Sequence, residues 1–117
     1  MARITLAYQL TASAAGSGTA QIYQVPSAKK LTITKVRVVG TPGTEGQLKI
    51  AIRRGQLNVV PSKGYIYPGE APIRLDCEVV FDSGDVVGVY YVNDDPTNPH
   101  TCWIYLEGTL ETERGGS

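Results

Sequence analysis

The chain has 117 residues, a length that fits one compact domain around a single core. Hydrophobic residues make up 42% of it and charged residues 19%, which excludes a disordered or collagen-like chain. No apolar run approaches the roughly 20 residues that cross a bilayer, so we expect a soluble protein with no membrane contact. The formal net charge is zero, which argues against a nucleic-acid-binding protein that neutralises phosphates with excess Lys and Arg.

Alternation of apolar and polar residues predicts β-strands along almost the whole chain, because successive side chains of a strand point to opposite faces. About eight short strands at this spacing predict a single-domain, all-β antiparallel sandwich or a small barrel. The strands at 31–39 and 48–52 flank a turn rich in Gly and Pro, so we expect them to form a hairpin. The expected strands are, in chain order, 4–10, 19–25, 31–39, 48–52, 57–60, 64–67, 73–81, 86–92 and 102–111.

The expected domain covers residues 1–111, and residues 112–117 are expected to be a flexible tail. The first 18 residues allow two interpretations. They either begin the domain's own sheet, or form an N-terminal strand and flexible arm that reaches a neighbouring subunit by strand addition. The start of the chain lacks the basic and apolar regions of a secretory signal, which predicts synthesis in a cytoplasm.

Charge is divided unevenly between the two halves of the sequence. Residues 1–58 carry a net charge of +7, and residues 59–117 carry −7. In a sandwich this division predicts ion pairs between strands of one molecule. It also fits a ring in which a basic edge of one subunit meets an acidic edge of the next.

Few residues in this sequence are suited to catalysis or metal binding. The single histidine, His100, lies two residues before Cys102, but no Asp or Asn is obviously placed to orient its imidazole. Cys77 and Cys102 match no zinc motif, and without a secretion signal we expect free thiols, although a disulfide remains open. We therefore expect no enzyme activity and no cofactor. Four loop carboxylates offer oxygen ligands for calcium but match no calcium-loop spacing: Asp82, Asp85, Asp94 and Asp95.

Aromatic residues are the strongest sign of a binding surface, since the chain holds seven Tyr and one Trp but a single Phe. On the last predicted strand, Trp103 and Tyr105 face away from Cys102 and its same-face neighbours. They belong either to an interior covered on both sides, to a protein interface, or to a sugar-stacking platform. The candidate interface residues are Ile4, Leu6, Tyr8, Tyr91, Trp103 and Tyr105.

Residues 25–36, 80–89 and 103–111 hold three turn-and-strand patterns, and together they resemble jelly-roll virion proteins of tailed bacteriophages. Residues 25–36 resemble a "VPxGK" turn followed by a strand, with Ala28 where that pattern has Gly. Residues 80–89 resemble an "F-x-x-G-D" hairpin, and residues 103–111 resemble the final strand of the same group. The resemblance implies a jelly-roll-like fold and a head-decoration or minor capsid protein, often trimeric.

The resulting expectation is a non-enzymatic structural protein of a phage virion. It would self-associate, with a homotrimer favoured, and bind the major capsid protein or another virion protein. The alternative is a carbohydrate-binding β-sandwich that uses Trp103 and nearby tyrosines. Changes in tryptophan fluorescence on adding oligosaccharides would distinguish the two.

Overall fold

The computed structural model describes residues 2–112, and this part of the chain folds into eight β-strands without a helix. No helix able to cross a membrane occurs in the described range. The all-β prediction is confirmed. The strands are β1 (Ala2–Ala12), β2 (Ser17–Gln24), β3 (Lys29–Gly40), β4 (Leu48–Arg54), β5 (Leu57–Val60), β6 (Ile73–Phe81), β7 (Val86–Asn93) and β8 (His100–Thr112).

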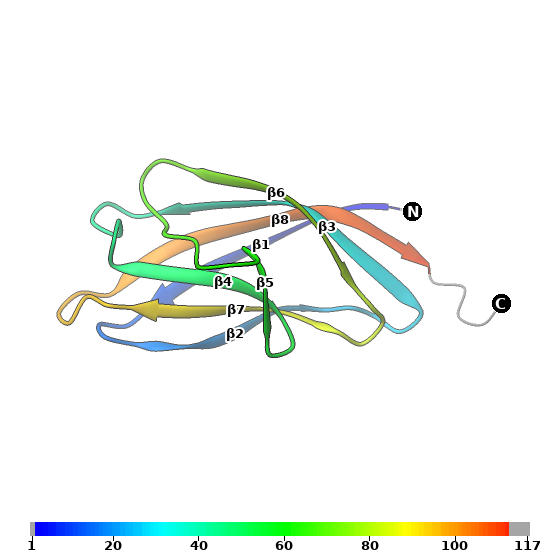
Figure 1. Ribbon diagram of the computed structural model, residues 1–117, viewed down its shortest axis with the longest axis horizontal. Helices are drawn as coiled ribbons and strands as arrows, with labels where there is room; N and C mark the ends of the chain where they lie inside the picture. The colour runs from blue at the N-terminus through cyan, green and yellow to red at the C-terminus, as the bar shows by residue number, and fades with distance from the viewer. Residues whose placement is uncertain (1, 113–117) are drawn as a thin grey trace.

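The strands form two four-stranded antiparallel sheets that pack as a sandwich (Figure 1). Sheet A has the order β1-β8-β3-β6, and sheet B has the order β2-β7-β4-β5. The first strand thus pairs with the last, the second with the seventh, the third with the sixth and the fourth with the fifth. Rolling up one long antiparallel hairpin gives this nesting, which is the jelly-roll arrangement. The predicted eight-stranded jelly-roll sandwich is confirmed.

Three expectations about the strands and their pairing are wrong. β3 and β4 form no hairpin, because β3 lies in sheet A and β4 in sheet B, and residues 41–47 cross from one sheet to the other. The turn at 82–85 likewise joins strands of different sheets, β6 and β7. Residues 64–67 form no strand and contribute a single bridge, between Ile66 and Ile50. Alternation shows which side chains share a face, but it does not show which strand lies alongside.

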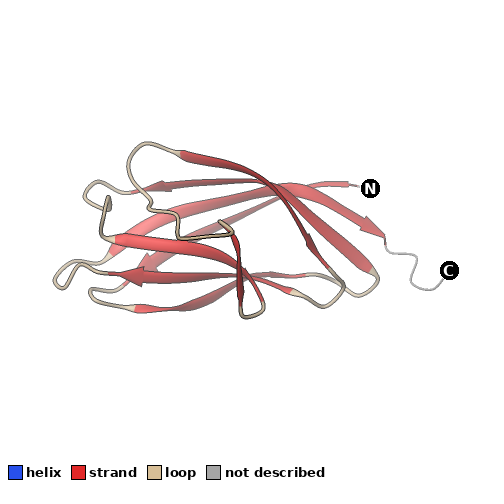
Figure 2. Cartoon of the chain, viewed as in Figure 1, coloured by secondary structure: helices blue, strands red, loops and turns tan. Residues whose placement is uncertain are grey.

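The seven connections divide between the two ends of the sandwich (Figure 2). Residues 13–16, 41–47, 61–72 and 94–99 lie at one end, called here the loop end. The other three connections lie toward the opposite end, where the described chain also begins and ends. β8 continues to Thr112, which pairs with Lys29, one residue into the expected tail. The rest of that tail, 113–117, lies outside the described residues.

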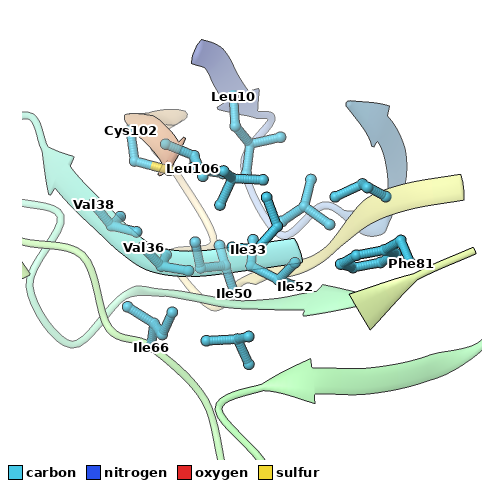
Figure 3. Packing of buried hydrophobic residues seen from close by; sticks show 14 of the residues in the cluster. Leu10, Ile33, Val36, Val38, Ile50, Ile52, Ile66, Phe81, Cys102 and Leu106 are labelled. Carbon is cyan, nitrogen blue, oxygen red and sulfur yellow. The ribbon is translucent and has the colours of Figure 1, made fainter. Parts of the chain in front are cut away.

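The core lies between the two sheets (Figure 3). On β8, Cys102, Ile104 and Leu106 point inward and are fully buried, as their alternation predicts. Burial of each large aliphatic side chain contributes about 1.5–3 kcal/mol to stability. The largest fully buried side chains are Phe81, Leu31, Ile33, Leu48, Ile50, Ile52, Ile104, Leu106, Val25, Val36, Val38 and Val87.

A bulge in β3 leaves no room for a side chain at Gly108 of β8. A Cβ at this position would lie 1.9 Å from the carbonyl oxygen of Thr32. The bulge falls between Ile33 and Lys35, and the hydroxyl of the extra residue, Thr34, donates to the carbonyl of Glu107 at 3.3 Å. Glycine at this position therefore allows β8 to pass close to the bulged strand.

Candidate interaction surfaces

The six predicted interface residues lie on two separate surfaces. Ile4, Leu6 and Tyr8 are on the inner face of β1, half-buried and packed against the core. Tyr91 is half-buried on the inner side of β7. Beside its ring, a Cβ on Gly18 would lie 3.2 Å from the tyrosine hydroxyl. Trp103 and Tyr105 instead point outward from β8 on sheet A, away from the core.

Trp103 and Tyr105 form an outer aromatic patch together with their neighbours in the adjacent strands. In register, Trp103 lies between Gln9 of β1 and Val39 of β3. Tyr105 lies opposite Arg37, whose guanidinium carbon is 5.4 Å from the ring centroid. Trp103 and Tyr105 are partly exposed, so the patch offers aromatic area to solvent on a central strand. Exposed aromatic areas of this kind suit contact with another macromolecule.

Arg37 also forms the only Lys or Arg ion pair with a carboxylate within 4 Å among residues 2–112. Its Nε lies 3.5 Å from Oε2 of Glu107, and both side chains are well exposed. Lys35 has Asp76 on one side and Glu107 on the other in register, without such a contact. The expected network of ion pairs between strands is therefore reduced to one pair. An exposed pair of this type contributes less than about 1 kcal/mol.

The outer face of sheet B is basic and aromatic. Lys49 lies 4.9 Å above the centroid of the Tyr65 ring, and Arg53 lies 5.5 Å above that of Tyr90. The two tyrosine rings are 6.1 Å apart. None of the four strands of sheet B contains an acidic residue. Each cation gains about 0.5–1 kcal/mol from its ring and remains beside solvent.

The side of the sandwich between β5 and β6, called here the β5–β6 side, exposes large apolar side chains. The exposed large hydrophobic residues of the described chain all lie on it: Leu57 at 63%, Tyr67 at 52% and Val80 at 37%. Two grooves run along it, with volumes of about 320 and 280 Å³, and share Pro61 and Leu75 in their walls. The inward-facing residues of β6 are only half-buried beneath these grooves: Ile73, Leu75, Cys77 and Val79.

The loop end holds a buried hydrogen-bond network around Asn93, Asp95 and His100. The amide of Asn93 donates to the carbonyls of Ala12 at 3.3 Å, Ser13 at 3.0 Å and Asn98 at 3.0 Å. Its Oδ1 accepts the backbone N–H of Asp95 at 3.0 Å. One side chain thus joins the loops 13–16 and 94–99.

Asp95 is the acceptor at the centre of this network. Its Oδ2 lies 2.8 Å from Nε2 of His100, and its Oδ1 accepts the backbone N–H groups of Thr97 at 3.0 Å and Asn98 at 3.1 Å. The hydrogen bond from Thr97, followed by those from His100 and Asn98, holds the pKa of Asp95 well below its usual range. An aspartate does orient the imidazole, contrary to what the sequence indicated.

These groups form a largely buried hydrogen-bond network. The hydroxyl of Thr44 lies 3.4 Å from Nδ1 of His100, and Asp95 contacts the other ring nitrogen. This order of groups resembles the nucleophile, base and acid of a catalytic triad. Thr44 is completely buried, however, so a substrate cannot reach it. Cys102 is also fully buried, and burial raises the pKa of its thiol to about 12. Cys77 and Cys102 are both free thiols.

The four candidate calcium ligands lie at opposite ends of the sandwich. Asp82 and Asp85 belong to the turn between β6 and β7, and Asp94 and Asp95 belong to the loop end. Asp85 is occupied locally, because its Oδ2 accepts the N–H of Asp82 at 2.8 Å. Within residues 2–112, no group of three or more His, Cys, Asp or Glu side chains is placed to hold a metal ion.

Sequence reasoning missed the β5–β6 side and the role of Asn93. The partners of Asn93 in β1 and the following loop lie 80 or 81 residues earlier, so no local pattern reveals them. Leu57 and Val80 were available as strand residues, but alternation does not report which inward-facing rows remain partly uncovered.

Comparison with known proteins identifies similar folds but no family. No protein-family model matches the chain, and no curated protein matches it. A chain of the acid-stable capsid of Helicobacter pylori bacteriophage KHP30 is 11% identical, with a TM-score of 0.50 over 94% of this chain and 97% of that chain. A chain of infectious bursal disease virus strain Gt is 11% identical with a TM-score of 0.49, over 99% of this chain but 34% of that one. A Bacillus endospore appendage protein is 14% identical with a TM-score of 0.41, over 94% of this chain and 88% of that one. At these identities the likeness concerns the fold alone.

Proposed function

We propose that this chain is a non-enzymatic structural protein of a viral capsid-type assembly, acting as a decoration or minor capsid protein of a phage. The observation that carries the proposal is the complete jelly-roll topology, β1-β8-β3-β6 against β2-β7-β4-β5. The likeness to a phage capsid chain supports it, since it extends over 97% of that chain's length. The protein would be made in the host cytoplasm and become part of the virion.

The outer aromatic patch is the proposed contact with the major capsid protein or another virion protein. Trp103 and Tyr105 offer a rigid apolar area on a central strand, and Arg37 adds a charged group at its margin. Interfaces are enriched in Trp, Tyr and Arg, which combine apolar area with polar contacts. The inward-facing residues Ile4, Leu6, Tyr8 and Tyr91 serve self-association, which we propose gives a homotrimer.

Light scattering across a wide concentration range tests the self-association. The expected result is a stable oligomer whose mass is three times that of the 12.6 kDa chain. Trp103→Ala should leave this mass unchanged, because the outer aromatic patch is assigned to a different partner. A monomer at every concentration contradicts self-association, and a different oligomer contradicts the trimer.

Carbohydrate binding is the second candidate, supported by the position of Gln9 beside Trp103 on the outer face of sheet A. An amide next to a partly exposed indole offers a hydrogen-bonding group beside a stacking surface, as sugar sites require. A shift or quench of Trp103 emission on titration with oligosaccharides, absent with a charged non-sugar polymer, would favour this function over the structural one.

A further inference from the structure

Sheet A ends in two strands that each have one unpaired edge. β8 and β3 have a strand on both sides, whereas β1 and β6 pair only with β8 and β3 among residues 2–112. The outer edge of β1, and that of β6 up to Val79, therefore carry backbone N–H and C=O groups without a strand partner. Free edges of this kind are sites at which another strand can add to a sheet.

Both edge strands also leave an apolar row incompletely covered. On β1 the inner side chains Ile4, Leu6 and Tyr8 are half-buried. On β6 the inner row from Ile73 to Val79 is half-buried beneath the grooves of the β5–β6 side. A strand added to one of these edges, with its own apolar row facing inward, would cover the apolar row of that edge strand, and its own row would be covered in turn.

We propose that β1 of one copy of this chain adds to β6 of a second copy, continuing sheet A from subunit to subunit. The proposal rests on the self-association proposed above and names the surfaces that carry it. Strand directions alternate through sheet A, because each of its three pairs is antiparallel. A copy placed in the same orientation therefore presents β1 antiparallel to β6, which preserves the alternation.

Charge and side-chain direction together narrow the register of this pairing. Inward-facing residues must lie opposite inward-facing residues, since a slip by one residue would turn each apolar row to solvent. Arg3 is the only charged residue of β1, and it faces outward, as do Asp76 and Glu78 of β6. Placing Arg3 opposite Glu78 of the second copy puts the small Ala7 opposite Arg74.

The same register joins the apolar rows and fits the length of the free edge. It places Ile4 opposite Cys77, Leu6 opposite Leu75 and Tyr8 opposite Ile73. The edge of β6 is closed beyond Val79, because Arg54 of sheet B donates from Nη1 to the carbonyl of Val80 at 2.9 Å. The pairing would thus begin with Ala2 opposite Val79, which is the residue of β6 where its outer edge becomes free.

The pairing joins two different surfaces, so it is heterologous. Such contacts close into a ring when the rotation between subunits permits it. Pairing of β6 with another β6 in the register centred on Cys77 is less favourable, because it sets Asp76 against Glu78 of the second copy. Arg3 of one subunit thus meets Glu78 of the next, in the second residue pair of the expected contact.

Disulfide trapping in the full-length protein tests the pairing directly. Ile4→Cys creates a thiol that would lie opposite the native Cys77 of the neighbour, at a distance across the pair that a disulfide spans. Within one molecule, β1 and β6 are separated by β8 and β3, or roughly 14 Å at about 4.8 Å per strand, so that bond cannot form. Under mild oxidation with copper phenanthroline, we expect covalent oligomers on non-reducing gels. The matched control, Thr5→Cys, faces outward opposite Asp76 and should stay uncross-linked.

Charge exchange provides a second readout that does not depend on a core-facing substitution. Arg3→Glu should raise the concentration at which the oligomer dissociates by at least tenfold. Combining Arg3→Glu with Glu78→Arg should return this concentration to that of the unmodified protein. Circular dichroism confirms that each variant is folded.

The outcomes separate this pairing from self-association in general. An oligomer by light scattering that shows no Ile4→Cys cross-link and no rescue by charge exchange overturns the pairing and leaves self-association standing. Cross-linking of the unmodified protein through Cys77 alone would show pairing of β6 with β6 and would also overturn it. A monomer at all concentrations removes both.

Discussion

The loop end and the β5–β6 side differ in how completely their polar groups are hydrogen-bonded and their apolar side chains are buried. At the loop end, the polar atoms of Asn93, Asp95 and His100 bond to one another and to three backbone carbonyls. On the β5–β6 side, Leu57, Tyr67 and Val80 are exposed, and the outer edges of both β5 and β6 have no strand partner among residues 2–112. Substitutions at the first region should therefore change the stability of the isolated subunit. Substitutions at the second should change association.

The largest effect is expected at Asn93. Asn93→Asp keeps the shape but replaces the donating amide with a carboxylate that faces the carbonyls of Ala12, Ser13 and Asn98. Because Asn93 is only 1% exposed, the free energy of unfolding should fall by about 3 kcal/mol. Urea denaturation measures the change. Asn58→Asp, on an exposed position of β5, is the control and should change little.

The next effect in size is expected at Asp95, and it should depend on pH. The folded protein holds the pKa of Asp95 below its ordinary value of about 3.9, so its stabilisation is complete above that pH. Stabilisation is then lost as the pH falls from there toward the lower pKa of the folded state. Asp95→Asn should lower the melting temperature at pH 7 and flatten its decline below pH 5.

The neighbouring residue supplies the control for Asp95. Asp94 contributes its backbone N–H, which donates to the carbonyl of Gln47 at 2.7 Å. Asp94→Asn preserves that bond, so its melting profile should follow that of the unmodified protein. Equal pH profiles for the Asp95→Asn and unmodified proteins would show that the carboxylate is not a source of stability.

Thr44 provides a smaller test of the same network. Thr44→Val keeps the volume of a fully buried side chain but removes the hydroxyl that lies 3.0 Å from the Thr41 hydroxyl and 3.4 Å from His100. We expect a loss of about 1 kcal/mol in the free energy of unfolding, as for one ordinary hydrogen bond. A gain in stability would mean that these contacts do not contribute.

The smallest effect on folding is expected on the β5–β6 side. Leu57→Ser should change the free energy of unfolding by less than about 0.5 kcal/mol, because the side chain is 63% exposed. Leu48→Ser, at a fully buried position of the same sheet, should cost several times more. A large loss at Leu57 would show that this side is part of the subunit's own core.

Much of the fold follows from local pattern, whereas the sites depend on contacts distant in sequence. Alternation and turn residues predict β5 and β6 with the bounds that the structure has, 57–60 and 73–81. Pairing was predicted wrongly for β3 and β4, because a turn of seven residues can join strands in one sheet or in two.

The sites were harder to predict for the same reason. Asp95 and His100 are only five residues apart, yet the fragment containing Asp95 has the composition of an ordinary loop. Trp103 and Tyr105 were correctly placed on one face of their strand, but the sequence could not show whether another element covers that face. The role of the six proposed interface residues remains a prediction.

The nested strand pairing has a consequence for how the chain acquires its structure. Ala2 pairs with Leu110, so the first strand cannot complete its sheet until the last strand is available. Such long-range closure slows folding relative to chains held together by neighbouring segments. During synthesis β1 therefore stays unpaired until β8, which is synthesised last of the eight strands, becomes available.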